Sequence, residues 1–252
     1  MAFIYTFAAL VGACIGSFIN VVILRLPEKG AFLSNKRSHC PECKAQIKPY
    51  NLIPVISYFI LRGRCFSCKT RISPRYPLVE LAGAAFAVIC LFKFGLSLSA
   101  VLAFGVIMIL LAIALIDYDT VEIPNSLVIA LIPFAIASVW LMPDAAILSR
   151  IIGIFSVALP MLLTSLAISG AFGGGDIKLM AVCGFLLGWE LTLLAFFIAL
   201  LLCAPVAVYT MANSKRKRGQ HIVFGPALCS GVVVSLFFGS EILNWYLGFL
   251  SF

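Results

Sequence analysis

Charged residues are scarce in this sequence. They form 11% of its 252 residues, whereas hydrophobic types form 63%. Soluble proteins average about 25% charged and about 45–50% apolar residues, so an ordinary water-soluble domain is excluded. The mean hydropathy of +1.13 agrees with this conclusion. Because one membrane span takes about 20 apolar residues, the chain has room for about eight spans and one sizeable polar loop.

Two further features are missing. No lysine or arginine precedes the first apolar segment, residues 3–24, which is also long enough to span a bilayer. A cleaved secretory signal would begin with basic residues and carry a shorter apolar core, so we expect a retained helix. No internal repeat is visible either, although such repeats are common in transporters.

We expect an all-α polytopic membrane protein with about eight transmembrane helices. The predicted spans cover residues 3–24, 78–92, 98–116, 123–141, 147–168, 177–187, 191–211 and 222–250. The one long polar segment, residues 28–76, lies between the first and second spans. The predicted domains are a first helix at 1–26, a four-cysteine loop at 27–76 and a seven-helix membrane domain at 77–252.

The positive charge is concentrated in two loops. Eleven of the 18 lysines and arginines lie between Arg25 and Arg75, and four more form the run Lys215–Arg218. Basic loops of membrane proteins stay in the cytoplasm, so both loops are placed inside and both termini outside. A nucleic-acid-binding surface is the competing interpretation of such runs, and we do not expect one in a membrane protein.

Four cysteines of the polar loop form two C-x-x-C pairs, Cys40 with Cys43 and Cys65 with Cys68, separated by 21 residues. This spacing is typical of zinc sites, in which four thiolates surround the metal tetrahedrally. A reducing cytoplasm disfavours the alternative, a redox-active or disulfide-bonded pair. We therefore expect a structural Zn²⁺ ion, which stabilises a loop that has little core of its own.

Two aspartates lie beside apolar segments, Asp117 at the end of the third predicted span and Asp176 at the start of the sixth. A carboxylate at bilayer depth costs about 2.5–3.5 kcal/mol, so it usually marks a functional site. The predicted topology brings both aspartates to the cytoplasmic side. Paired carboxyls hydrolyse a peptide bond when the ionised one takes a proton from water and the protonated one donates to the substrate. The sequence therefore predicts an intramembrane aspartyl peptidase.

The helix ends suggest a role for each acid. Asp176 stands at a helix start, where the dipole favours its anion, whereas Asp117 stands near a helix C-terminus. Our hypothesis makes Asp176 the resting base and Asp117 the resting acid. The alternative role for Asp176 is that of a helix cap. Asp119 and Glu122 lie farther toward the loop, where solvation or substrate positioning is the expected role.

Gly173, Gly174 and Gly175 precede Asp176 in a predicted active-site loop that also includes Lys178. Glycine lets a substrate backbone approach closely and tolerates unusual backbone angles. The Lys178 ammonium group is placed to neutralise a carboxylate or to extend to the membrane interface.

Several motifs follow one another in a characteristic order. They are Gly16-Ser17-Phe18-Ile19-Asn20-Val21-Val22, Arg25-Leu26-Pro27, the two C-x-x-C pairs, Arg62-Gly63-Arg64-Cys65, Arg75-Tyr76-Pro77-Leu78-Val79-Glu80, Asp117 and Gly173-Gly174-Gly175-Asp176. In this combination the chain resembles the bacterial type IV prepilin peptidases, which are bifunctional leader peptidases and N-methyltransferases, over nearly its whole length. The glycine–aspartate element alone is less specific, because presenilin-type proteases share it.

The resemblance implies a multi-pass enzyme of the bacterial inner membrane. It implies that Asp117 and Asp176 cleave type IV pilin-like precursors after a glycine, at the cytoplasmic face. The family then methylates the new N-terminal residue from S-adenosylmethionine, an activity associated with the cysteine loop, and the residues that bind this cofactor stay unassigned. Asn125 stands where many relatives carry aspartate.

The expected partners are prepilin or pseudopilin precursors of pilus or secretion systems, together with the lipid bilayer. The alternative from another class is a small proton-coupled transporter that uses the intramembrane aspartates.

Overall fold

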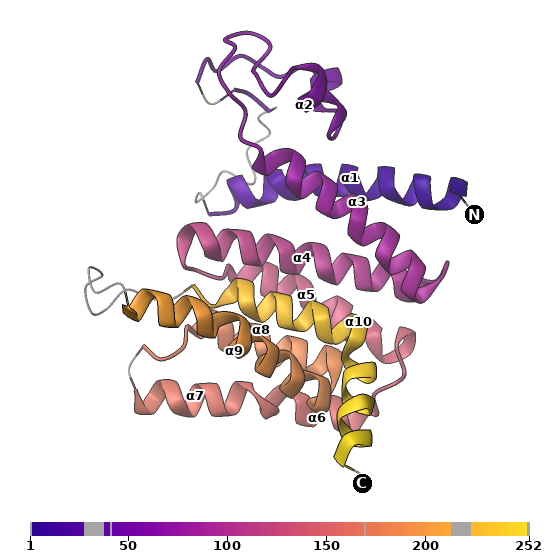
Figure 1. The fold of residues 1–252 in the computed structure, drawn as a ribbon, viewed down its shortest axis with the longest axis vertical. Helices are drawn as coiled ribbons and strands as arrows, with labels where there is room; N and C mark the ends of the chain where they lie inside the picture. Colours follow the sequence, from indigo (N-terminus) through magenta and orange to yellow (C-terminus); the bar gives the residue numbers. More distant parts are fainter. Residues whose placement is uncertain (1, 28–37, 41, 169, 213–222, 251–252) are drawn as a thin grey trace. The chain divides into compact units, whose positions relative to one another are not determined.

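The structure, a computed structural model, describes residues 2–27, 38–40, 42–168, 170–212 and 223–250. Within these residues every regular element is a helix, and β pairing is limited to two isolated bridges. The elements are α1 (Ala2–Arg25), the 3₁₀ helix η1 (Pro49–Leu52), α2 (Ile56–Ile60), α3 (Arg75–Phe94), α4 (Leu98–Thr120), α5 (Asn125–Leu141), α6 (Ile147–Ser156), α7 (Ala158–Ala167), α8 (Gly174–Leu187), α9 (Trp189–Ala212) and α10 (Gly225–Leu250) (Figure 1). The prediction of an all-α protein is confirmed.

Six helical segments of the described chain are long and apolar enough to cross a membrane. They are α1, α3, α4, α6 and α7 taken together, α9 and α10. The apolar helix α5 has 17 residues and α8 has 14, so both are shorter than the others. These two helices account for the difference between six spans and the predicted eight. Eight membrane crossings stay a prediction.

The predicted span at residues 147–168 is divided in two. Helix α6 ends at Ser156 and α7 begins at Ala158, with Val157 between them at φ −111° and ψ −40°. Pro160 gives the physical reason for this break. A proline lacks the backbone N–H and its ring crowds the carbonyl group four residues earlier, which here belongs to Ser156.

The chain divides into two compact units, Met1–Phe104 and Gly105–Phe252. In the first unit α1 packs along α3. A Cβ atom on Gly12 of α1 would collide with the carbonyl oxygen of Gly83 in α3, so the two backbones are in contact. Asn20 Nδ2 donates to Tyr76 O at 3.0 Å. Small residues and a cross-helix asparagine thus have the packing role that is usual for them in membrane helices.

In the second unit α8 is central despite its length, because it packs against α5, α6, α7, α9 and α10 (Figure 1). The side chains of Leu179, Met180 and Cys183 are buried there. A Cβ atom on Gly184 of α8 would collide with the carbonyl oxygen of Gly153 in α6. Contacts on several sides therefore hold α8, and with it the residues at its start, in one position.

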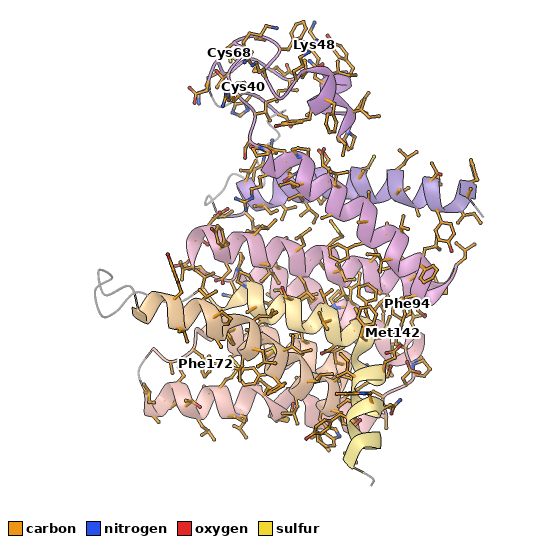
Figure 2. The ribbon with its side chains drawn as sticks, viewed as in Figure 1. Cys40, Lys48, Cys68, Phe94, Met142 and Phe172 are labelled. Atoms are coloured by element: carbon orange, nitrogen blue, oxygen red, sulfur yellow. The ribbon has the colours of Figure 1, made fainter. Side chains whose placement is uncertain are left out.

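Arg150 joins the C-terminal ends of two helices in this unit. Its side chain is 1% exposed. Nη1 donates to Ser138 Oγ at 2.7 Å in α5 and to Leu186 O at 2.8 Å in α8, and Nη2 donates to Met142 O beyond the end of α5. Met142 is labelled in Figure 2. Carbonyl groups at helix C-termini lack partners within their own helix and carry partial negative charge, so a buried guanidinium satisfies them.

Candidate active site and metal centre

Asp117 lies in the last turn of α4, and its side chain is 5% exposed. The backbone N–H of Gly225, the first residue of α10, donates to Asp117 Oδ2 at 2.9 Å. A Cβ atom on Gly225 would lie 2.5 Å from the same oxygen, so only glycine admits the carboxyl group at this distance. Asp117 therefore lies at the end of α4 and contacts the beginning of α10.

Asp176 occupies the first turn of α8 and is half-buried. Its Oδ2 accepts a hydrogen bond of 3.2 Å from the backbone N–H of Gly173, the residue just before the helix. An aspartate that receives an N–H at a helix start is held in place and is favoured as an anion by the dipole. Asp176 thus caps the start of α8, as considered from the sequence. Its other carboxylate oxygen, Oδ1, receives no hydrogen bond from the described residues.

The two aspartates lie near each other in the second unit. Asp117 and Asp176 interact electrostatically. The segments that carry them also touch: a Cβ atom on Gly175 would lie 2.8 Å from Cβ of Ile123, just beyond α4. The burial of α8 and the loop after α4 therefore bring together two acids that lie 59 positions apart in the sequence.

Lys178 contacts the amide group of Asn125. Its Nζ donates to Asn125 Oδ1 at 3.0 Å and links the start of α8 to the start of α5. The sequence suggested that Lys178 neutralises a carboxylate or extends to the interface, and this amide partner was not foreseen. The exposed side chains of Asp119 and Glu122 fit the solvated role expected for them.

The predicted active-site glycines differ in their surroundings. Gly174 has open space on its Cβ side, with no atom within 4 Å. A Cβ atom on Gly173 would lie 3.0 Å from Asp176 Oδ2. Among the three, Gly174 alone leaves room for another group next to Asp176. A side chain at Gly173 would meet the Asp176 carboxylate, and one at Gly175 would meet Ile123.

Three phenylalanine rings pack together next to Gly173 and Gly225, whose N–H groups bind the two aspartates. Phe172 precedes Gly173, and Phe224 precedes Gly225; their ring centroids are 5.8 Å apart. Phe196 of α9 completes the cluster, with centroids 6.3 Å from both. Figure 2 labels Phe172 among the helices of the second unit. Tilted and edge-on ring pairs at this distance are attractive, so the cluster holds the segments that present both N–H groups.

The cysteine loop contains two turns of the same construction. In the first, Cys40 N–H donates to Ala45 O and Lys44 N–H donates to Cys40 O. In the second, Cys65 and Lys69 make the equivalent bonds 25 positions later. An isolated antiparallel bridge closes each turn. Each turn presents two sulfur atoms on one side.

The four thiols form one cluster. The sulfur atoms of Cys40, Cys43, Cys65 and Cys68 all lie within 4.8 Å of one another, and the Cys40–Cys68 pair, labelled in Figure 2, is 3.8 Å apart. A tetrahedral zinc site with Zn–S bonds of about 2.3 Å has sulfur–sulfur edges of about 3.8 Å. The donor set and its spacing fit a Zn²⁺ ion.

Gly225 and the aromatic cluster were not predicted from the sequence. A Gly-Pro pair at residues 225–226, following the basic run, is a helix-start signal that could have drawn attention to this position. Nothing in the local sequence connects it with Asp117, from which it is 108 positions distant. The basic run Lys215–Arg218 and the beginning of the polar loop, residues 28–37, lie outside the described residues.

Two family profiles match most of this chain. Residues 10–94 match the profile of the bacterial peptidase A24 N-terminal domain, and residues 104–208 match that of the type IV leader peptidase family. No solved structure is significantly similar.

Curated relatives match over most of their length. The prepilin leader peptidase/N-methyltransferase of Bacillus subtilis (strain 168) is 31% identical, over 94% of this chain and 95% of the relative. Proteins of the same name from Burkholderia pseudomallei (strain K96243) and Legionella pneumophila are 35% and 30% identical, over 93% and 98% of this chain and 85% and 96% of theirs. The chain therefore belongs to the type IV leader peptidase family.

Proposed function

We propose that this protein is an intramembrane aspartyl endopeptidase that removes the short basic leader from type IV pilin-like precursors. The single observation that supports this best is the meeting of Asp117 and Asp176, each held by one backbone N–H. Family membership supports the substrate class, because the relatives are named prepilin leader peptidases. The transporter considered from the sequence has no support from these comparisons.

The proposed mechanism gives the two acids different roles. Asp176, in the first turn of α8, is proposed as the base that takes a proton from the attacking water. Asp117, 5% exposed, is the acid and donates to the substrate carbonyl oxygen or to the leaving amine. Each acid has one oxygen fixed by glycine, which leaves its second oxygen for the reaction.

Both acids lie at helix starts, which differs from the prediction made from the sequence. From the sequence, only Asp176 stood at a helix start; in the structure Asp117 also faces one, that of α10. The positive ends of α8 and α10 therefore both point toward the reacting groups. Preorganised N–H groups of this kind stabilise negative charge that develops during acyl transfer. The dipole therefore does not by itself distinguish the base from the acid, and the asparagine variants below test each role.

We further propose that the protein N-methylates the new N-terminus with S-adenosylmethionine. The relatives' printed name includes N-methyltransferase. S-adenosylmethionine would supply the methyl group to the amine released by cleavage. The zinc-binding loop, residues 27–76, is proposed as the domain associated with this step, with residues 77–252 forming the peptidase domain and residues 1–26 the first span.

The proposed setting is the bacterial inner membrane, with the loop and both acids at the cytoplasmic face and both termini outside. The charge of the polar loop and the apolar helices support this orientation. Prepilins fit it, because a basic leader followed by an apolar helix presents its scissile bond at the same boundary.

Cleavage of a purified precursor tests the proposal. The full-length protein is incubated with a pilin precursor and S-adenosylmethionine, and the product is identified by mass spectrometry. Asp117→Asn and Asp176→Asn should each leave the precursor intact, while the matched controls Asp119→Asn and Glu122→Gln should cleave it. Full cleavage by either Asp117→Asn or Asp176→Asn would refute the assignment of these acids.

A further inference from the structure

A basic hollow lies in the cysteine loop, away from the thiols. It has a volume of about 550 Å³ and is lined by Tyr58, Arg62, Gly63, Arg64, Arg71, Ile72, Ser73 and Pro74. Three of these residues are arginines and none is acidic. None of the zinc-binding cysteines lines it, although Arg64 directly precedes Cys65. The peptidase and metal functions therefore leave this hollow unexplained.

Two of the arginines face each other across an antiparallel bridge, Arg64 opposite Arg71. Like charges placed directly opposite each other destabilise such a pair. The first turn of the loop shows that the construction does not require them, because its equivalent bridge joins His39 to Gln46. The second turn therefore carries two permanent positive charges at positions where the first turn, built in the same way, carries none.

No partner within the described chain neutralises this charge. The side chains of Arg62, Arg64 and Arg71 form no ion pair with any described residue. The described residues therefore offer the hollow no counter-charge, and its three guanidinium groups can accept an anion.

The position of the hollow indicates the source of that anion. Arg71 lies four residues, and so at most about 14 Å of extended chain, before the start of the candidate span α3. Val55 N–H donates to Glu80 Oε2 at 2.7 Å, which ties the loop to the first turns of α3. Arg71 therefore lies near the start of this candidate span, the level at which lipid headgroups meet a membrane helix. The hollow also contains the amphipathic ring of Tyr58, and its lining by Ile72 and Pro74 suits a glycerol backbone.

We propose that this arginine hollow binds the phosphodiester of an acidic phospholipid headgroup. Arginine guanidinium groups bind phosphate oxygens in a two-pronged geometry, and basic pockets beside membrane helices hold anionic lipids. S-adenosylmethionine is a poorer match because its sulfonium and ammonium groups meet three positive charges and no acid. The proposal does not depend on the peptidase function, and its test measures binding alone.

The test uses the full-length protein in detergent, titrated with phosphatidylglycerol or phosphatidylcholine and followed by native mass spectrometry. The arginine variant is R62Q/R64H/R71Q, which gives the second turn the histidine and glutamine of the first. The control, K44Q/K48Q/K69Q, removes the same charge from lysines of the same loop that do not line the hollow. Zinc content, measured on each variant, reports whether the loop is folded.

The wild type should retain one phosphatidylglycerol. A basic residue near an acidic surface contributes about fivefold in affinity, so the arginine variant should bind it about 100-fold more weakly. The lysine variant should stay within about threefold of the wild type, and phosphatidylcholine should bind weakly to all three. If the triple variant lost zinc, R64H/R71Q alone should retain it and lose about 25-fold in affinity.

Three results would overturn the proposal. The first is an equal loss in the lysine variant, which would indicate a diffuse charge effect. The second is an arginine variant that keeps its zinc and also its lipid affinity. The third is displacement of the lipid by millimolar inorganic phosphate or by S-adenosylmethionine with the same arginine dependence, which would assign the hollow to a soluble ligand.

Discussion

Replacing Gly225 by alanine should disable catalysis without unfolding the protein. The new Cβ atom would lie 2.5 Å from Asp117 Oδ2 and 2.8 Å from its Cγ. Ordinary van der Waals contact begins at 3.4 Å, so the carboxyl group or the start of α10 must move by 3.4 − 2.5 = 0.9 Å. A misplacement of about 1 Å costs about 100-fold in rate, which corresponds to about 2.7 kcal/mol of transition-state stabilisation.

The measurement is cleavage of a purified precursor at varied substrate concentration. We expect kcat to fall about 100-fold while KM changes less than about twofold, because the substrate still binds and only the acid is misplaced. Thermal unfolding should stay within a few degrees of the wild type, since the change adds one methyl group at the first residue of α10.

Gly248→Ala is the matched control on the same helix, because its added Cβ would meet no atom within 4 Å. It should keep full activity. If Gly225→Ala folded normally and kept kcat within about threefold of the wild type, the position of Asp117 would not control the reaction, and the proposed pairing of the acids would fail.

Three further outcomes follow from the same geometry. Gly174→Ala should remain active, whereas Gly175→Ala should lose at least about tenfold in kcat because its Cβ would lie 2.8 Å from Ile123; the same cleavage assay checks both. Arg150→Met should lower the unfolding free energy by about 3 kcal/mol and the midpoint temperature by about 6–12 °C, because carbonyl groups at two helix ends lose their donor; thermal unfolding in detergent checks this. Removal of zinc by a chelator should open the cysteine loop to proteolysis and reduce methylation more than leader cleavage; metal analysis, digestion patterns and product mass check this.

Features that depend on residue type and spacing were predictable from the sequence. The four cysteines meet because two C-x-x-C turns of the same construction can share one metal. Gly12 and Asn20 lie at the α1–α3 contact, where residues of small size or hydrogen-bonding amides are expected in membrane helices. The start of α8 near Asp176, at Gly174, also follows from local signals, since glycine and aspartate mark a helix beginning.

Features that depend on distant parts of the chain were not predictable. The Gly225–Asp117 bond and the contacts of Arg150 join segments whose relation is set by packing. A single arginine in an apolar segment gives no sign that two helix ends will meet around it. The number of spans was uncertain for a related reason: α8 is short and is held by its neighbours, and hydropathy alone does not distinguish such a helix from a full span.

The phenylalanine cluster makes the two acids mechanically dependent on each other. Phe172 and Phe224 directly precede the two glycines whose N–H groups bind the aspartates. A shift of either ring therefore changes the position of both carboxyl groups. Phe196 is half-buried, so one edge of the phenylalanine cluster is accessible from outside. A small apolar compound bound at Phe196 would therefore inhibit catalysis without contacting either aspartate. The side of α9 that carries Phe196 is thus a binding site for inhibitors that do not resemble a peptide.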